Sequence, residues 1–109
     1  MQKNHLVKNM QIVEYFRIIG DNIRRLRVES GMSQKELAKK AEVGNSAIQA
    51  TEAGKEITLT NLIKIAKALG VEPPDLFISD KDREEISYKH KLFMEKISGL
   101  LEEVGKTKK

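Results

Sequence analysis

Amide side chains at helical spacing are the residues of this sequence best suited to chemistry. Asn45 and Gln49 lie four residues apart with Ser46 beside them, so a helix here would direct all three outward and turn Ile48 inward. An Asn or Gln amide can bind adenine at N6 and N7 together in the DNA major groove. The residue types therefore favour hydrogen-bonded recognition.

A second short helix is expected to position this stretch. Ser33 is a good N-cap and Glu36, three residues later, can complete a capping box, which predicts a helix over 34–41. The next three residues break the helical pattern. A further helix can begin at Asn45 or Ser46 and end near Glu52, giving two short helices joined by a tight turn.

At these residues the chain resembles the helix-turn-helix of the Cro and phage-repressor type, the XRE family. The resemblance extends in register from Ile19 to Phe77, over more than half of the chain. Its motifs are Ser33-Gln34, Leu37-Ala38, Val43, Ser46-Ala47-Ile48 and Glu52-Ala53-Gly54. It implies an all-α fold, a five-helix repressor-like DNA-binding domain, here with an additional C-terminal amphipathic helix.

The resemblance also implies roles for individual residues. Base-reading positions carry over to Gln34, Asn45, Ser46, Gln49 and Ala50. An internal ion pair is expected between Arg27 and Glu52. Because the second helix has no Arg or Lys, we expect it to read A·T pairs better than G·C pairs. Alternatives stay open for these residues. Gln34 could support the recognition helix, at about 45–52, and Ser46 could serve only as a cap. Asn45 and Gln49 could be solvated surface residues.

Phosphate contacts are expected around the motif. Lys55 is the foremost charged candidate, and helix N-termini at Ser33 and near Asn61 would direct backbone N–H groups at DNA, with Lys64 nearby. Clustered Arg and Lys residues on the first two helices support this expectation.

The pattern departs from the family at three places. Glu42 stands where the turn commonly has Gly, which predicts a non-glycine residue in a left-handed or otherwise adapted turn. Thr51 replaces a larger apolar residue and should thin the core, and the segment after Gly54 lacks the common Pro.

Flanking helices should supply the core. The spacing predicts a helix from Gln11 to Ser30, with Gly20 as a possible bend; a strand over 12–19 is the alternative. Thr58 or Thr60 should cap a fourth helix, and Pro74 to Phe77 should form a fifth. The residues expected to face the core are Ile12, Phe16, Ile19, Ile23 and Leu26, then Leu59, Leu62, Ile63, Ile65, Ala66 and Leu69, then Leu76 and Phe77.

A second amphipathic pattern follows a charged link at residues 80–82. Its heptad-like stripe comprises Ile86, His90, Phe93, Ile97, Leu100 and Val104. Such a stripe must be buried, either on its own domain or against the same helix of a second chain. The chain thus divides into a flexible arm over 1–10, a DNA-binding domain over 11–78 and a dimerisation element with a basic tail over 79–109.

Composition narrows the function further. Five of the 20 Lys and Arg lie within 1–10 and 106–109, so residues 11–105 sum to −1 and bulk charge says little about DNA. There is no Cys, and His5 and His90 lie far apart, so we expect no metal site and no cofactor. We find no catalytic constellation, membrane span or signal peptide, and predict a non-enzyme in the cytoplasm.

The sequence therefore predicts a sequence-specific transcription regulator, a repressor that binds an inverted-repeat operator in double-stranded DNA as a homodimer. Three alternatives remain. The protein could be an antitoxin with a toxin partner, a restriction-modification controller, or a protein-interaction module that does not bind DNA.

Overall fold

The computed structural model describes residues 11–107, and within this range all regular elements are helical. The predicted arm over 1–10 and the end of the basic tail lie outside the described residues. The chain forms two compact units, one ending at Ile78 and one beginning at Ser79. The elements are α1 (Ile12–Glu29), α2 (Gln34–Ala41), α3 (Asn45–Glu52), α4 (Leu59–Leu69), the 3₁₀ helix η1 (Pro73–Phe77) and α5 (Asp80–Thr107).

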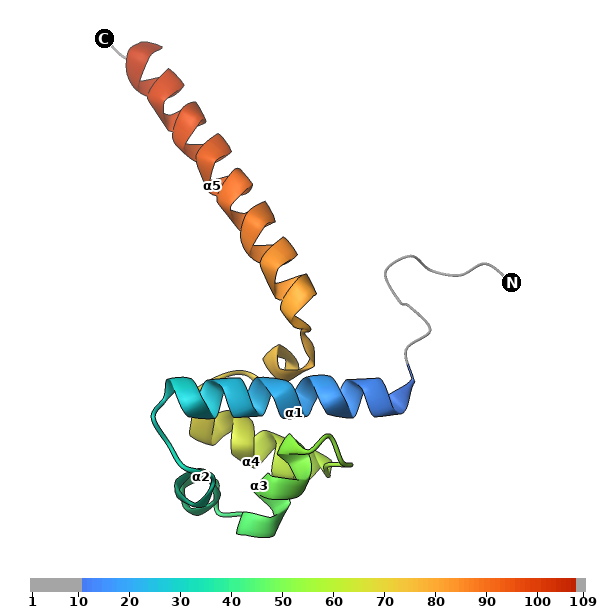
Figure 1. The fold of residues 1–109 in the computed structure, drawn as a ribbon. Helices are drawn as coiled ribbons and strands as arrows, with labels where there is room; N and C mark the ends of the chain where they lie inside the picture. Colours follow the sequence, from blue (N-terminus) through green and yellow to red (C-terminus); the bar gives the residue numbers. More distant parts are fainter. Residues whose placement is uncertain (1–10, 108–109) are drawn as a thin grey trace. The chain divides into compact units, whose positions relative to one another are not determined.

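In the first unit α1 packs across the other helices. It contacts α3, α4 and η1, while α2 packs against α3 and α4, and Figure 1 shows α2, α3 and α4 on one side of α1. Apolar residues from every element meet in one core, whose fully buried members include Ile23, Leu37, Ile48, Ile65 and Leu76. Burial of this core holds the two short helices in place, because helices of eight residues are not stable alone.

Helix ends follow the predicted signals closely. Ser33 caps α2 with a capping box to Glu36, and Thr58 caps α4 by accepting from the backbone N–H of Asn61 at 3.1 Å. Glu42 is left-handed at φ 60°, as its place in the turn predicts. The α1 boundaries agree with the helix prediction within one residue at each end, so the strand alternative is wrong.

An open apolar groove corrects the predicted core. Ile12, Leu59 and Phe77 were expected inside, but their exposed fractions are 69%, 70% and 42%, because they form the rim of a groove of about 320 Å³. Ile63 is also 46% exposed. Periodicity gave most of the inward face correctly, but at these four positions no element of the described chain fully covers the side chain.

Gly20 serves a different purpose from the one expected. Helix α1 continues through it, and a Cβ built there would lie 2.3 Å from the carbonyl oxygen of Thr51 on α3. Thr51 itself is only 3% exposed. A glycine is therefore required at this helix crossing, where the two backbones approach too closely for any side chain.

A buried amide joins the ends of the first unit. Asn22 is 2% exposed, and its Nδ2 donates to the carbonyl oxygens of Leu76 and Ile78, each at 2.8 Å. These carbonyl groups lie at the end of η1, where the helix itself supplies no N–H donor for them. Sequence analysis missed Asn22 because a polar residue beside an apolar stripe usually faces solvent.

The second unit is a single helix over its described residues. Helix α5 spans 28 residues. Figure 1 shows its ribbon without interruption. Along its predicted stripe Ile86, Phe93, Leu100 and Val104 have exposed fractions between 54% and 62%. As a single helix it leaves these apolar side chains open to water.

Substituting Gly20 by Ala tests the α1–α3 crossing. We expect Gly20→Ala to destabilise the protein by about 1–3 kcal/mol, because the new methyl group overlaps a backbone oxygen and the helices must separate. Thermal unfolding followed by circular dichroism measures this. Gly99→Ala is the control, since a Cβ there meets nothing within 4 Å; equal melting temperatures for both variants would contradict the crossing.

Candidate nucleic-acid interface

The turn between α2 and α3 is closed by backbone and lysine contacts. After left-handed Glu42 the N–H of Val43 donates to the carbonyl oxygen of Ala38 at 3.0 Å. Lys64 of α4 donates from Nζ to the carbonyl oxygen of Glu42 at 3.4 Å. These contacts set the direction in which α3 leaves the turn.

Helix α3 presents the predicted polar face. Asn45, Ser46 and Gln49 are exposed, Ala50 is half-buried, and Ile48 is fully buried beneath them. Helix α3 starts at Asn45 after the cap residue Gly44, so Ser46 lies within the helix and the alternative that it acts only as a cap is wrong. Neither the Asn45 amide nor the Gln49 amide makes a hydrogen bond to another described residue. Their donors and acceptors are therefore open to a ligand.

One buried carboxylate joins the three helices behind this face. Glu52, at the end of α3, is only 4% exposed. Its Oε2 accepts from Arg27 Nε of α1 at 2.6 Å, and its Oε1 accepts from Arg27 Nη2 and from Gln34 Nε2 of α2, both at 3.0 Å. A fork of this kind fixes both the angle and the position of α3 relative to α1 and α2.

A second arginine reaches the same carboxylate more loosely. Arg24 Nε lies 3.4 Å from Glu52 Oε1, and its side chain is 57% exposed, against 13% for Arg27. Arg27 also donates from Nη1 to the carbonyl oxygen of Met32 at 2.9 Å. Sequence analysis assigned Glu52 to Arg27 alone, although Arg24 stands one turn earlier on the same face of α1. One carboxylate facing two guanidinium groups leaves a net positive charge beside α3.

The electrostatics of the pair follow from its hydrogen bonds. Burial alone would raise the pKa of Glu52, but hydrogen bonds from Arg27 and Gln34 and the charge of Arg27 outweigh it, so the pKa lies below the ordinary 4.5. The pKa of Arg27 is raised, chiefly by its hydrogen bond to Glu52. The pair therefore stays ionised at neutral pH.

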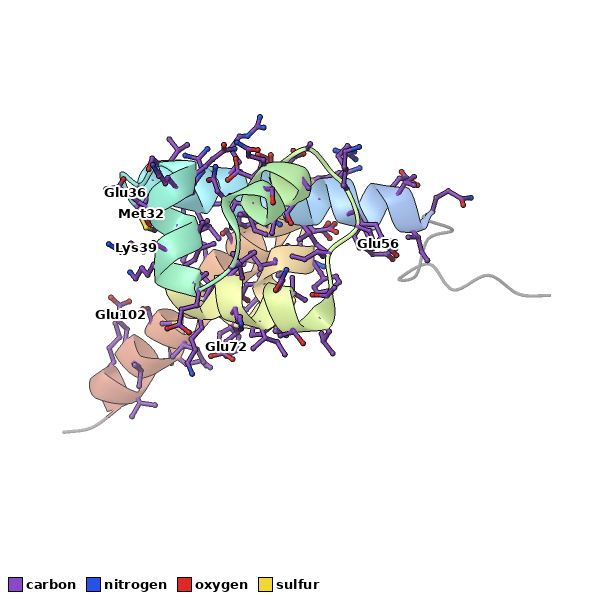
Figure 2. All side chains as sticks on the ribbon, turned by 90° about the horizontal axis from the view of Figure 1, so that it is seen from below. Met32, Glu36, Lys39, Glu56, Glu72 and Glu102 are labelled. Atoms are coloured by element: carbon purple, nitrogen blue, oxygen red, sulfur yellow. The ribbon has the colours of Figure 1, made fainter. Side chains whose placement is uncertain are left out.

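The predicted phosphate residues lie around the same helices, with one correction. The backbone N–H of Ser33 was expected to point outward, but it donates to Glu36 Oε1 at 2.8 Å in the capping box. Lys55 is exposed in the loop after α3, and Asn61 is half-buried in the first turn of α4. Figure 2 shows α2, α3 and α4 side by side in front of α1, with Lys39 projecting outward from α2.

Among residues 11–107 there is no group of three or more His, Cys, Asp or Glu side chains that could hold a metal ion. None of the described helices combines the length and hydropathy needed to cross a membrane.

Two short helices joined by a left-handed turn, the second with an exposed polar face, define a helix-turn-helix DNA-binding domain. Residues 23–76 match the family described as Helix-turn-helix. The chain belongs to this family, in the XRE type of DNA-binding transcription regulators.

Relatives of known identity agree with the assignment. Control protein C.BamHI of Bacillus amyloliquefaciens is 39% identical over 61 residues, which cover 54% of this chain and 75% of the relative. The restriction-modification controller protein C.AhdI from Aeromonas hydrophila is 35% identical with a TM-score of 0.55, over 57% of this chain and 96% of that one. SinR, a master regulator for biofilm formation solved in complex with DNA, is 33% identical with a TM-score of 0.51, over 53% and 95%.

Removing each arginine in turn tests which one holds α3. Arg27→Met should cost about 3–5 kcal/mol of unfolding free energy, because it leaves the buried Glu52 carboxylate without its main partner. Arg24→Met should cost less than about 1 kcal/mol, since its contact is long and exposed. Urea unfolding at neutral pH measures both, and equal losses would contradict the assignment.

Acid should remove the contribution of Glu52. Because its pKa is lowered on folding, the carboxylate stabilises the fold fully above its ordinary pKa of 4.5, and this stabilisation is lost as pH falls through the lower folded value. We expect the difference in unfolding free energy between the wild type and Glu52→Gln to be constant near neutral pH and to shrink below pH 4.5. A difference that does not change in acid would contradict the lowered pKa.

Proposed function

We propose that the protein is a repressor that binds an inverted-repeat operator as a homodimer through α3. One observation carries this proposal: the exposed amides of Asn45 and Gln49 stand on a helix that the buried Glu52 fork holds rigidly. Preorganised donors and acceptors bind at a low entropic cost. We propose that the chain binds DNA, catalyses no reaction and acts in the cytoplasm.

Base reading would fall to five side chains with different chemistry. Asn45 and Gln49 suit adenine N6 and N7, Ser46 can donate or accept, and Ala50 can contact only a thymine methyl group. Gln34 uses its Nε2 on Glu52, so its carbonyl oxygen remains to accept from a base or a neighbouring amide. This set favours A·T pairs.

Phosphates would supply most of the affinity. Lys55 is an exposed lysine three residues after the end of α3, and Arg24 adds the charge that Glu52 does not neutralise. Lys64 and the side chain of Asn61 stand at α4, while Ser33 would contribute its hydroxyl proton. Each phosphate neutralised releases counterions, so binding should weaken steeply as salt rises.

Dimerisation would come from α5. Two chains joined along Ile86, His90, Phe93, Ile97, Leu100 and Val104 would bury the stripe that a single helix exposes. Joined domains could place two α3 helices about 34 Å apart, in successive major grooves on one face of DNA. A dimer on a promoter would block polymerase.

A narrower role is favoured by the relatives. C.BamHI is a control protein, and C.AhdI is a restriction-modification controller. This chain could therefore control transcription of a restriction-modification operon with the same domain. The family match ends at residue 76, before α5 begins, so α5 would add a function outside that match.

A DNA site selected from a random duplex pool by the wild-type chain provides the test of this function. The affinities of the wild type and of variants for that site are then compared. Gln49→Ala should weaken binding to the selected site by about 10-fold or more per half-site, since each bidentate base contact is worth about 1–3 kcal/mol. Binding to unrelated DNA should change little. Fluorescence anisotropy measures both affinities.

Lys55→Gln should act on all sequences alike. Removing one phosphate contact from each subunit should reduce the slope of log affinity against log salt by about two for a dimer. Lys67→Gln, an exposed lysine in the last turn of α4, is the matched control. No selectable site, or a slope unchanged by Lys55→Gln but changed by Lys67→Gln, would contradict the proposed interface.

A further inference from the structure

The amide of Asn22 holds the backbone where the chain leaves the DNA-binding unit. Its Nδ2 carries two protons, and the carbonyl oxygens of Leu76 and Ile78 each accept a hydrogen bond from this nitrogen at 2.8 Å. Asn22 is only 2% exposed, and Leu76 is fully buried. Moving the amide away would leave a buried carbonyl group without its donor, which costs free energy. Residues 76–78 are therefore tied to α1 by polar contacts as well as by packing.

A single residue separates this clamp from α5. Ile78 is the last residue of the first unit, and α5 begins at Asp80. The residue between them, Ser79, is already engaged by the helix. Its Oγ accepts from the backbone N–H of Asp82 at 3.2 Å, and its carbonyl oxygen accepts from the backbone N–H of Arg83 at 2.9 Å. Because each residue adds only two soft backbone dihedral angles, this link supplies few rotatable bonds.

The helix that carries Asn22 also holds the recognition helix. Arg27 of α1 binds the carboxylate of Glu52 at the end of α3. Gly20 of α1 allows the close approach to the carbonyl group of Thr51. Asn22 lies between Gly20 and Arg27 in the sequence. One helix thus fixes both the base-reading element and the point at which the chain leaves the unit.

The freedom of this exit point matters for a dimer on DNA. Two recognition helices must reach successive major grooves about 34 Å apart. One base pair more or less between the half-sites changes their separation by about 3.4 Å and their relative rotation by about 35°. A dimer with a rigid exit from each unit cannot follow such a change, whereas a dimer with a loose exit can.

We propose that Asn22 determines which half-site spacing the regulator accepts, by fixing the point at which each chain passes from the DNA-binding unit to α5. Asn22 is a positioning residue. It contacts neither base nor phosphate and acts through the backbone of residues 76–78. The inference rests on the proposed function, because it takes the α5-linked dimer on an inverted repeat as its unit.

Changing the half-site spacing of the selected operator tests the proposal. Adding or removing one central base pair should weaken binding of the wild type at least about 10-fold, because avidity is lost when geometry hinders simultaneous engagement. Asn22→Ala should reduce this penalty to about 3-fold or less, since residues 76–78 lose their donor and the exit loosens. Fluorescence anisotropy with the full chain measures each affinity.

The control separates this effect from a general loss of stability. Ile65→Val truncates another fully buried residue of the same unit but removes no polar contact, so it should keep the spacing penalty of the wild type. Asn22→Leu repeats the test with a side chain of similar shape that has no donor. Inserting two glycine residues between Ile78 and Ser79 leaves the clamp in place and should lower the penalty as Asn22→Ala does. Circular dichroism verifies that each variant is folded at the temperature of the measurement.

The outcomes distinguish two kinds of failure. If the folded Asn22 variants keep the full penalty, or if Ile65→Val loses it equally, the role of Asn22 is overturned while the dimeric regulator stands. A penalty that survives the glycine insertion would also overturn it, because the exit point would then not set the spacing. A wild type that sediments as a monomer or selects no inverted repeat would overturn the proposed function itself.

Discussion

The fold of the DNA-binding unit depends on the ion pair that Glu52 makes at its centre. This carboxylate is buried where α1, α2 and α3 meet, and it receives two hydrogen bonds from Arg27 and one from Gln34. A buried charge is tolerated only when it is matched in this way. The same fork that satisfies Glu52 sets the angle of α3, so the stability of the core and the direction of the recognition face are one constraint.

Close packing at the same end of α3 adds a second constraint. Gly20 lets the backbone of α1 approach the carbonyl group of Thr51, and a larger residue at position 20 would push α3 away from α1. Polar contacts and close backbone contact, both at the C-terminal end of α3, hold a helix of only eight residues. Rigidity of this kind is what a base-reading helix needs, because the amides must meet a base edge within a fraction of an ångström.

Sequence reasoning predicted what depends on local signals. Caps at Ser33 and Thr58, the left-handed Glu42 and the bounds of α2 and α3 follow from capping and turn chemistry, which act within a few residues. Contacts between distant residues were predicted less well. Asn22 is buried because η1 ends above it, and Ile12, Leu59 and Phe77 are exposed because no side chain of residues 11–107 fills the groove between their helices. Neither fact is contained in a periodic pattern. The Arg27–Glu52 pairing came from family resemblance, and Arg24 was missed because it is a weaker second partner.

The central claim is that α3 reads adenines in the major groove. The most direct measurement is interference by 7-deazaadenine, which lacks the N7 acceptor, placed singly at each adenine of a selected operator. The account predicts that affinity falls at two symmetry-related groups of adenines about one helical turn apart, and that Gln49→Ala removes the effect at one position in each group. If 7-deazaadenine had no effect at any adenine, or if its effects were not related by two-fold symmetry, the claim that α3 reads adenines would be contradicted.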